Sequence, residues 1–257
     1  MPSYRASDGA ALAYYDQGPS GEIPLLLVHG WQADHRVWTP LGALLARERR
    51  VVSVDLRGAG ASSEAPGPYR IERFADDLAE LIEAIDLDPV VAVGHSMGGK
   101  IAVRFALEHP EALEGLVLIA PVALGPARLP PKLEAVLRST IGDPVATARW
   151  LARLTLGERS EASTQLLRGA AASVPPEVAR ESLESWTTLD LAADAATSDT
   201  PALVLAPEGD APQIARATVA DVLGGSRFAV VAQAGHYAML DRPERLADAI
   251  EDFIENF

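Results

Sequence analysis

Short apolar runs alternate with amphipathic helical patterns over most of the chain, and this alternation limits the possible folds more than any other feature. The runs typical of buried strands are at 23–28, 51–55, 90–93, 116–120, 202–206 and 228–231. Near the start, 4–6 and 10–15 flank Asp8-Gly9, a pair suited to a tight hairpin turn. Strands that alternate with helices form a mostly parallel sheet covered on both faces. We therefore predict an α/β fold with an eight-stranded, mostly parallel sheet and helices on both faces.

Residues 121–198 interrupt the alternation with an all-helical pattern. Asp143-Pro144 has the form of an N-cap followed by proline at the first helical position, and we expect roughly four short helices here. The segment is inserted after the sixth predicted strand, at the sheet edge where α/β proteins bind ligands. We predict a catalytic core of residues 1–120 and 199–257, with residues 121–198 as a helical cap, or lid, over a pocket.

Composition excludes several classes of function. The net charge is −14, whereas nucleic acids and anionic membranes attract basic surfaces, so we expect neither as a partner. The chain has no cysteine, which excludes disulfides, thiolate nucleophiles and cysteine-bound metals. The first residues carry no basic and apolar leader pattern, and no apolar stretch approaches the roughly 18 residues of a membrane span. We predict a cytoplasmic protein that needs no metal and no organic cofactor.

The sequence GHSMGG at residues 94–99 joins a predicted strand directly to a predicted helix. G-x-S-x-G in that context is the signature of a nucleophile elbow, a turn so sharp that its neighbours must be glycine. Gly94 and Gly98 meet this requirement. A simple turn between a strand and a helix would not need both glycines around a serine, so we predict Ser96 as a nucleophile.

A serine nucleophile needs a base, and five histidines are available. His95 lies inside the elbow, His109 ends a helix, and His29 and His35 come early in the chain. In chains with the order serine, acid, histidine, the base comes late, on a loop after a strand. His236 follows the last predicted strand, so we predict it as the general base.

The acid should lie between the nucleophile and the base, again after a strand. The stretch PALVLAPEGDAP offers Glu208 and Asp210, and Asp210 is favoured because a residue a few positions beyond the strand has the reach to meet His236. An oxyanion hole needs two backbone N–H donors. We predict those of Met97, after the nucleophile, and of Trp31, in the loop after the strand at 23–28.

The cap supplies the remaining candidate site residues. Its apolar side chains would form a substrate pocket, although the same side chains are also what helices bury. The predicted substrate contacts are Leu133, Leu137, Trp150 and Trp186. Two interpretations remain for its arginines, which are either solvated or favour an anionic substrate; these are Arg128, Arg138, Arg149 and Arg153. On the elbow helix, Lys100 and Arg104 are expected to face solvent or to pair with acids.

Taken together, the motifs of this sequence resemble those of the α/β-hydrolase superfamily over nearly the whole chain. The matching stretches are HGW at 29–31, DLRGAGAS at 55–62, GHSMGG at 94–99, the Asp210 loop, and GHYAMLDRPE at 235–244. In similar proteins the motif with Asp55 and Arg57 is mainly structural, so no chemistry is assigned to either residue.

The resemblance implies hydrolysis of a small-molecule ester, with an apolar acyl or alcohol part, through an acyl-enzyme. Similar proteins with this triad include cofactor-free perhydrolases (haloperoxidases), lactonases and carbon–carbon bond hydrolases, and the first of these is the main alternative. Its members often have proline after the oxyanion residue, where this chain has Gln32. Relatives that dehalogenate substrates or open epoxides use an aspartate nucleophile, which Ser96 does not match. A non-catalytic ligand-binding member of the fold is the remaining alternative.

Overall fold

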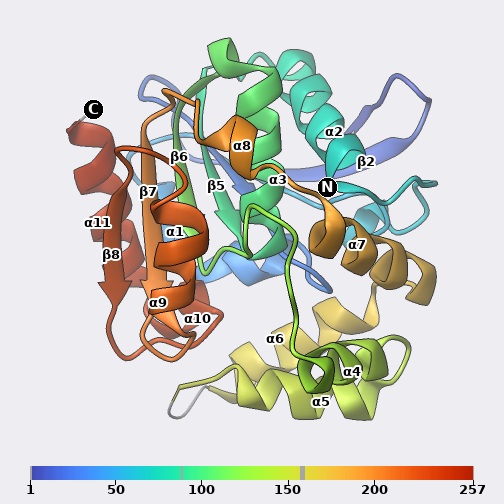
Figure 1. Ribbon diagram of the computed structural model, residues 1–257. Coiled ribbons are helices and arrows are strands. Elements are labelled where there is room, and N and C mark those ends of the chain that lie inside the picture. The colour runs from blue at the N-terminus through green and yellow to red at the C-terminus, as the bar shows by residue number, and fades with distance from the viewer. Residues whose placement is uncertain (1, 88, 157–159, 257) are drawn as a thin grey trace.

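A twisted eight-stranded sheet forms the centre of the computed structural model, which describes residues 2–87, 89–156 and 160–256 (Figure 1). The strands lie in the order β1-β2-β4-β3-β5-β6-β7-β8. They are β1 (Ser3–Arg5), β2 (Ala11–Gln17), β3 (Leu25–Val28), β4 (Val51–Val54), β5 (Val90–His95), β6 (Leu113–Ile119), β7 (Ala202–Pro207) and β8 (Arg227–Val231). The β1–β2 hairpin joins β4 in antiparallel orientation, and all other neighbours are parallel. The predicted fold class is confirmed.

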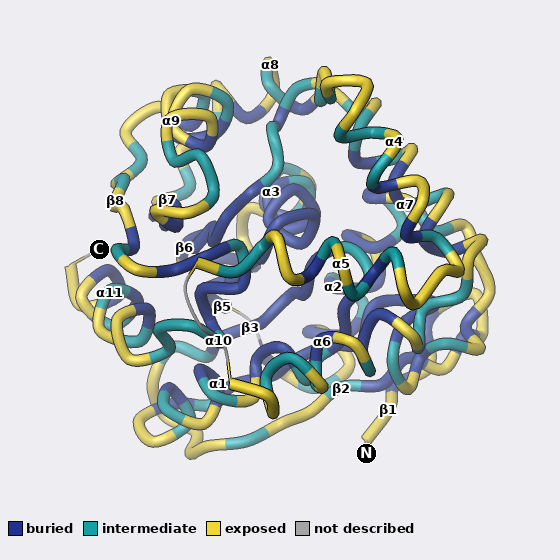
Figure 2. Tube along the Cα trace, turned by 90° about the horizontal axis from the view of Figure 1, so that it is seen from below, coloured by how far each residue is buried: buried dark blue, intermediate teal, exposed yellow. Residues whose placement is uncertain are grey.

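Two apolar layers cover the sheet because successive side chains of a strand point to opposite faces. In β3, Leu26 and Val28 join the layer with α2 (Ile71–Ala84) and α3 (Met97–Glu108), whereas Leu25 and Leu27 join the layer with α1 (Thr39–Leu45) and α11 (Pro243–Glu255). All four residues of β3 are fully buried. Figure 2 shows the central strands as a buried layer surrounded by exposed loops and helix faces.

Outside residues 121–198, the other described helices connect these layers or lie at the ends of strands. They are η1 (His35–Trp38), η2 (Gly60–Ser62), η3 (Pro110–Ala112), α9 (Pro212–Ala215), η4 (Arg216–Ala220) and α10 (Ala238–Asp241). None of the helices described is long and apolar enough to cross a lipid bilayer.

Residues 121–198, for which we keep the name cap, lie between β6 and β7. The described part of the cap contains α4 (Pro131–Thr140), α5 (Pro144–Arg153), α6 (Glu161–Ala172), α7 (Pro176–Thr188) and α8 (Ala192–Ala195), one helix more than we expected. Asp143 caps α5 as predicted, accepting hydrogen bonds from the N–H groups of Val145 and Ala146. Helices α4, α5 and α6 gather on one side of the core (Figure 1).

The position of Lys100 differs from our expectation. Its side chain is fully buried, and its ammonium donates to the main-chain carbonyls of Gly125 (3.1 Å), Trp186 (3.0 Å) and Leu189 (2.6 Å). Gly125 lies where the chain enters the cap, and Trp186 and Leu189 lie where it returns toward the core. Lys100 therefore ties both connections of the cap to the elbow helix. Arg104 behaves as predicted and pairs with Glu108.

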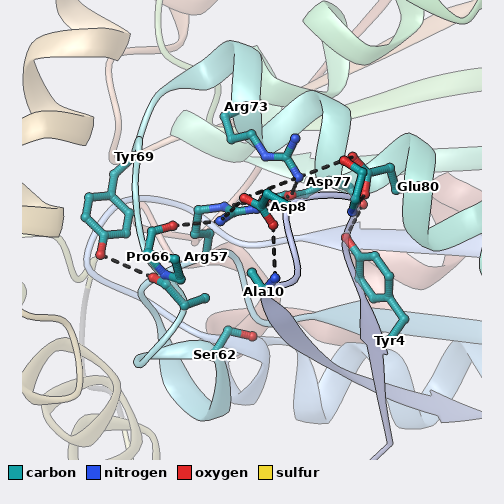
Figure 3. Close-up of polar contacts among 12 residues, drawn as sticks. Tyr4, Asp8, Ala10, Arg57, Ser62, Pro66, Tyr69, Arg73, Asp77 and Glu80 are labelled. Carbon is teal, nitrogen blue, oxygen red and sulfur yellow. Dashed lines mark hydrogen bonds and ion pairs between the residues drawn. The ribbon is translucent and has the colours of Figure 1, made fainter.

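A second buried cation, Arg57, joins the N-terminal hairpin to α2 (Figure 3). Its guanidinium contacts both carboxylate oxygens of Asp77, at 2.9 and 2.7 Å, and Asp8 at 2.8 Å. Burial alone would lower the pKa of Arg57, but the hydrogen bonds and charges of Asp77 and Asp8 raise it overall. Tyr4 donates its hydroxyl to the main-chain oxygen of Asp77. Arg57 thus links elements of the core, as a mainly structural motif should.

Candidate active site

Ser96 lies at the junction of β5 and α3 in a conformation that few residues adopt. Its φ is +54° and its ψ is −117°. A Cβ at position 94 would lie 2.4 Å from the oxygen of Gly98, and a Cβ at position 98 would lie 2.3 Å from the oxygen of Val28. Both distances are shorter than any tolerable contact, so only glycine fits at either position. The two glycines allow β5, the turn and α3 to approach closely enough to hold a strained, largely buried serine at the carboxyl end of β5.

The loop after β3 lies directly against this serine. A Cβ at Gly30 would come within 3.0 Å of the Ser96 Cβ. His29 fixes the loop from inside the core: its Nε2 accepts from the N–H of Leu56 at 3.0 Å, so its Nδ1 carries the proton and donates to the oxygen of Gly30 at 2.9 Å. Burial lowers the pKa of His29, which keeps it neutral in this role.

The two residues predicted as oxyanion donors lie at the start of α3 and in the loop after β3. Met97 is the first residue of α3, where backbone N–H groups have no partner within the helix. In the described residues the N–H of Trp31 has no hydrogen-bond acceptor, while its indole N–H donates to the oxygen of Ala179 in α7 at 2.8 Å. The indole bond holds the Trp31 main chain in place and leaves its amide available.

Asp210 and His236 meet at the carboxyl ends of β7 and β8. The Asp210 Oδ2 is 2.6 Å from the His236 Nδ1. The other candidate acid, Glu208, turns elsewhere and accepts from the N–H of Gln233 at 2.8 Å. Ala211, with φ of +49°, bends the chain away just after Asp210. The histidine side chain is 18% exposed and the aspartate 30%, so the pair is accessible at the rim of the sheet.

His95 connects the nucleophile to the base. Its Nε2 lies 3.0 Å from the main-chain oxygen of His236, and the two rings are 4.7 Å apart between centroids. In the described part of the chain no direct hydrogen bond joins the hydroxyl of Ser96 to His236; such bonds are often long until substrate is bound. The geometry therefore brings Ser96, Asp210 and His236 to the carboxyl ends of β5, β7 and β8. The loop after β3 that carries Trp31, which we call the oxyanion loop, lies beside Ser96.

Comparison with known proteins places this arrangement in a family. Residues 25–249 match the model of the Alpha/beta hydrolase family. The chain belongs to this family. An esterase from Exiguobacterium antarcticum superposes with a TM-score of 0.90 at 23% identity, over 99% of each chain, a similarity that shows the fold alone. A thermophilic esterase from Thermogutta terrifontis superposes with a TM-score of 0.81 at 28% identity, over 99% of this chain and 98% of that chain.

Curated relatives match only in part. A non-heme chloroperoxidase from Streptomyces lividans is 33% identical over 124 residues, which are 48% of this chain and 45% of that protein. For the chloroperoxidase and seven other curated relatives, the match covers between 28% and 45% of the relative's own length. This α/β hydrolase therefore has relatives of more than one activity.

The four cap residues predicted to contact substrate belong to the apolar layer that also contains Met97. Leu137 and Trp186 are buried in the cluster that contains Met97, and Leu133 and Trp150 pack against it, as Trp31 does. A separate cavity of about 590 Å³ opens between cap helices, where Gln32, Thr140 and Ala179 are among its lining residues. Ser96, Asp210 and His236 do not line this cavity. Arg128, Arg149 and Arg153 are exposed, and Arg138 pairs with Glu134.

One group of metal-ligand residue types lies near the site, but its atoms are already engaged. Asp34, His35 and Asp55 bring their ligand atoms within 4.8 Å of one another. Asp34 accepts from the guanidinium and N–H of Arg36, and Asp55 accepts from the N–H and Nδ1 of His35 and from the N–H of Ala61. Burial lowers the pKa of His35, but the hydrogen bond and charge of Asp55 raise it overall. The cluster fixes the loops after β3 and β4.

Sequence reasoning missed three participants near the site. His95 was considered only as a rival base, although its ring holds the main chain of His236. Lys100 is predicted to face solvent or to pair with acids, but its partners are main-chain carbonyls. The carbonyl of Leu154, which accepts from the N–H of His236 at 2.9 Å, belongs to the main chain of the cap and leaves no mark in the sequence.

Proposed function

We propose that this α/β hydrolase cleaves carboxylic esters through an acyl-enzyme formed on Ser96. The observation that carries the proposal is the contact of 2.6 Å between Asp210 and the Nδ1 of His236, at the sheet edge where Ser96 occupies the elbow. With Nδ1 donating to Asp210, Nε2 is left as the acceptor that a general base needs.

Each step has a residue to perform it. His236 takes the proton of Ser96 as the hydroxyl oxygen attacks the ester carbonyl. Asp210 keeps the imidazole in the required tautomer and stabilises its charged form. The N–H groups of Met97 and Trp31 bind the oxyanion, and one such donor contributes roughly 3 kcal/mol in the transition state. His236 then protonates the leaving alcohol, and it later activates the water that releases the acid.

The proposed substrate is a small ester with an apolar acyl or alcohol part. The apolar surroundings support this choice, because Leu137 and Trp186 of the cap are buried in the same apolar layer as Met97, and Trp31 packs against that layer. The alternative function is perhydrolysis, in which hydrogen peroxide replaces water in the second step. The chloroperoxidase relative favours that alternative, and the triad would serve both reactions.

Turnover of short p-nitrophenyl esters tests the proposal. We expect hydrolysis without peroxide, and its loss in Ser96→Ala. Peroxide-dependent halide oxidation, measured in parallel, distinguishes perhydrolysis: if it greatly exceeds ester turnover, the alternative holds. Failure of both activities over a panel of esters, thioesters and lactones would contradict the proposal and favour a non-catalytic member of the fold.

A further inference from the structure

The end of cap helix α5 lies against the loop that carries His236. The main-chain oxygen of Leu154, the C-cap residue of α5, accepts from the N–H of His236 at 2.9 Å. A Cβ at Gly235 would lie 2.3 Å from that oxygen and 2.8 Å from the nitrogen of Leu156. The cap main chain and the histidine loop are therefore so close that position 235 has no space for a side chain.

The same cap segment also contacts the loop of the acid. A Cβ at Gly209, the residue before Asp210, would lie 3.0 Å from the Cβ of Leu156. Residues 154–156, which we call the α5 tail, thus touch both the Asp210 loop and the His236 loop. Leu151 is buried in the core cluster that contains Ala234, and Leu154 packs against it, which anchors the tail.

The core holds the other side of the histidine loop. The Nε2 of His95 lies 3.0 Å from the main-chain oxygen of His236, and the carboxylate of Asp241 accepts from the N–H of Gly235 at 2.9 Å. The N–H of His236 is therefore held by the cap, and its main-chain oxygen is held by the core.

We propose that the α5 tail positions the catalytic histidine, so that His236 is correctly placed only while the cap rests on the core. The inference depends on the proposed function, because it assigns a positioning role to the cap in that reaction. Its consequence is that any displacement of α5 also displaces the base. The cap would then affect kcat as well as substrate binding.

Two substitutions separate the tail from the loop in different ways. Gly235→Ala places a methyl group against the main chain of the tail and forces the two apart. Leu154→Ala removes the side chain that anchors the tail and leaves its carbonyl in place. Gly224→Ala is the matched control, because a Cβ there meets no atom within 4 Å. Thermal unfolding of each variant shows whether it is folded.

Two measurements report whether His236 is displaced and whether its displacement slows the reaction of the serine. Amide hydrogen exchange of His236, followed by NMR, reports the bond to Leu154 without requiring activity. The rate of labelling by a fluorophosphonate reports the reactivity of the serine, and misplacement of a catalytic group by about 1 Å costs on the order of 100-fold. We expect faster exchange at His236 and labelling slowed about tenfold to 100-fold in Gly235→Ala, a smaller change in the same direction in Leu154→Ala, and no change in Gly224→Ala.

The outcomes distinguish this inference from the proposed function. If folded Gly235→Ala and Leu154→Ala label as fast as Gly224→Ala, the positioning role is wrong while the serine hydrolase proposal stands. If exchange at His236 is unchanged in both variants, the bond to the cap does not hold the loop, and the inference is likewise overturned. If the unmodified protein is not labelled at all, the proposed function fails and the inference fails with it.

Discussion

The two halves of the candidate site are held by different parts of the molecule. Ser96 is fixed by core contacts that admit only glycine at positions 94 and 98. The loop after β3 is fixed by the buried ring of His29 and, at Trp31, by the bond of its indole N–H to Ala179 of the cap. His236 is fixed partly by the core, through His95, and partly by the cap, through Leu154. The core thus positions the nucleophile at the carboxyl end of β5, whereas the core and the cap together position the base.

The comparison explains how one core can serve several activities. A nucleophile held by the core need not move when the cap changes. The main chain of the base and the position of Trp31 both depend on contacts with the cap, so we expect variation in the cap to alter binding and catalysis together. Four predictions below test this division, in order of decreasing effect.

Ser96→Ala removes the nucleophile and gives the largest expected loss. Esterase kcat should fall by roughly 10⁶-fold, as loss of a nucleophile does in other serine hydrolases. The thermal midpoint should not fall, because alanine lacks only the hydroxyl. Steady-state ester hydrolysis with calorimetry measures both. Substantial residual turnover would show that another residue is the nucleophile.

Asp210→Asn affects the base half, and Glu208→Gln is its control. Asparagine at 210 stabilises the wrong imidazole tautomer, so kcat should fall by about 10⁴-fold. Glutamine at 208 should change kcat much less, because Glu208 contacts the Gln233 N–H and not the imidazole. The same ester assay compares them. Equal losses in the two variants would mean that the two acids share the role.

Gly94→Ala tests how tightly the core packs around the nucleophile, and its expected effect is on the stability of the fold. Its Cβ would lie 2.4 Å from a main-chain oxygen of α3, which must move. We expect the free energy of unfolding to fall by about 1–3 kcal/mol, as for other overpacked cores. Urea denaturation checks this, with Gly224→Ala again as control. A Gly94→Ala protein as stable as the control would show that the elbow tolerates a side chain.

Lys100→Met tests the attachment of the cap to the core through a smaller, pH-dependent effect. Burial lowers the pKa of Lys100 from 10.5 to about 8, partly offset by the charges of Asp190 and Glu72. Between these values the unfolded state binds more protons than the folded state, so the contribution of Lys100 to stability rises with pH from about 8 to 10.5. Chemical denaturation at several pH values should show this rise in the unmodified protein relative to Lys100→Met.

A pH-independent difference between the two proteins would contradict the lowered pKa. The direction of its pKa shift distinguishes Lys100 from Arg57, the other buried cation described above. Arg57 faces two carboxylates that compensate its charge, and its pKa is raised. Lys100 donates to carbonyls, which satisfy its hydrogen bonds but carry no net charge.

The sequence predicted the nucleophile half of the site more completely than the base half. The glycines around Ser96 are visible because a strained turn restricts residue types, and the alternation of strands and helices places that turn at the sheet edge. Asp210 and His236 could be chosen from their order in the chain and from their position after strands. These signals all arise from side chains or from backbone conformations that only some residues adopt.

The contacts with the cap could not be predicted for the same reason. Leu154 acts through its carbonyl, which every residue has. Lysine is almost always exposed unless it is paired, and the partners of Lys100 are main-chain oxygens from both connections of the cap. Local sequence patterns do not show which distant main-chain groups meet in the folded protein.

The site of covalent labelling by a fluorophosphonate tests the central claim most directly. After incubation, digestion and peptide mass spectrometry, the account predicts one adduct per chain, on Ser96. The adduct should be absent in Ser96→Ala and should form far more slowly in His236→Ala. An adduct on another residue, or no adduct on a folded protein, would contradict the assignment of Ser96 as the nucleophile.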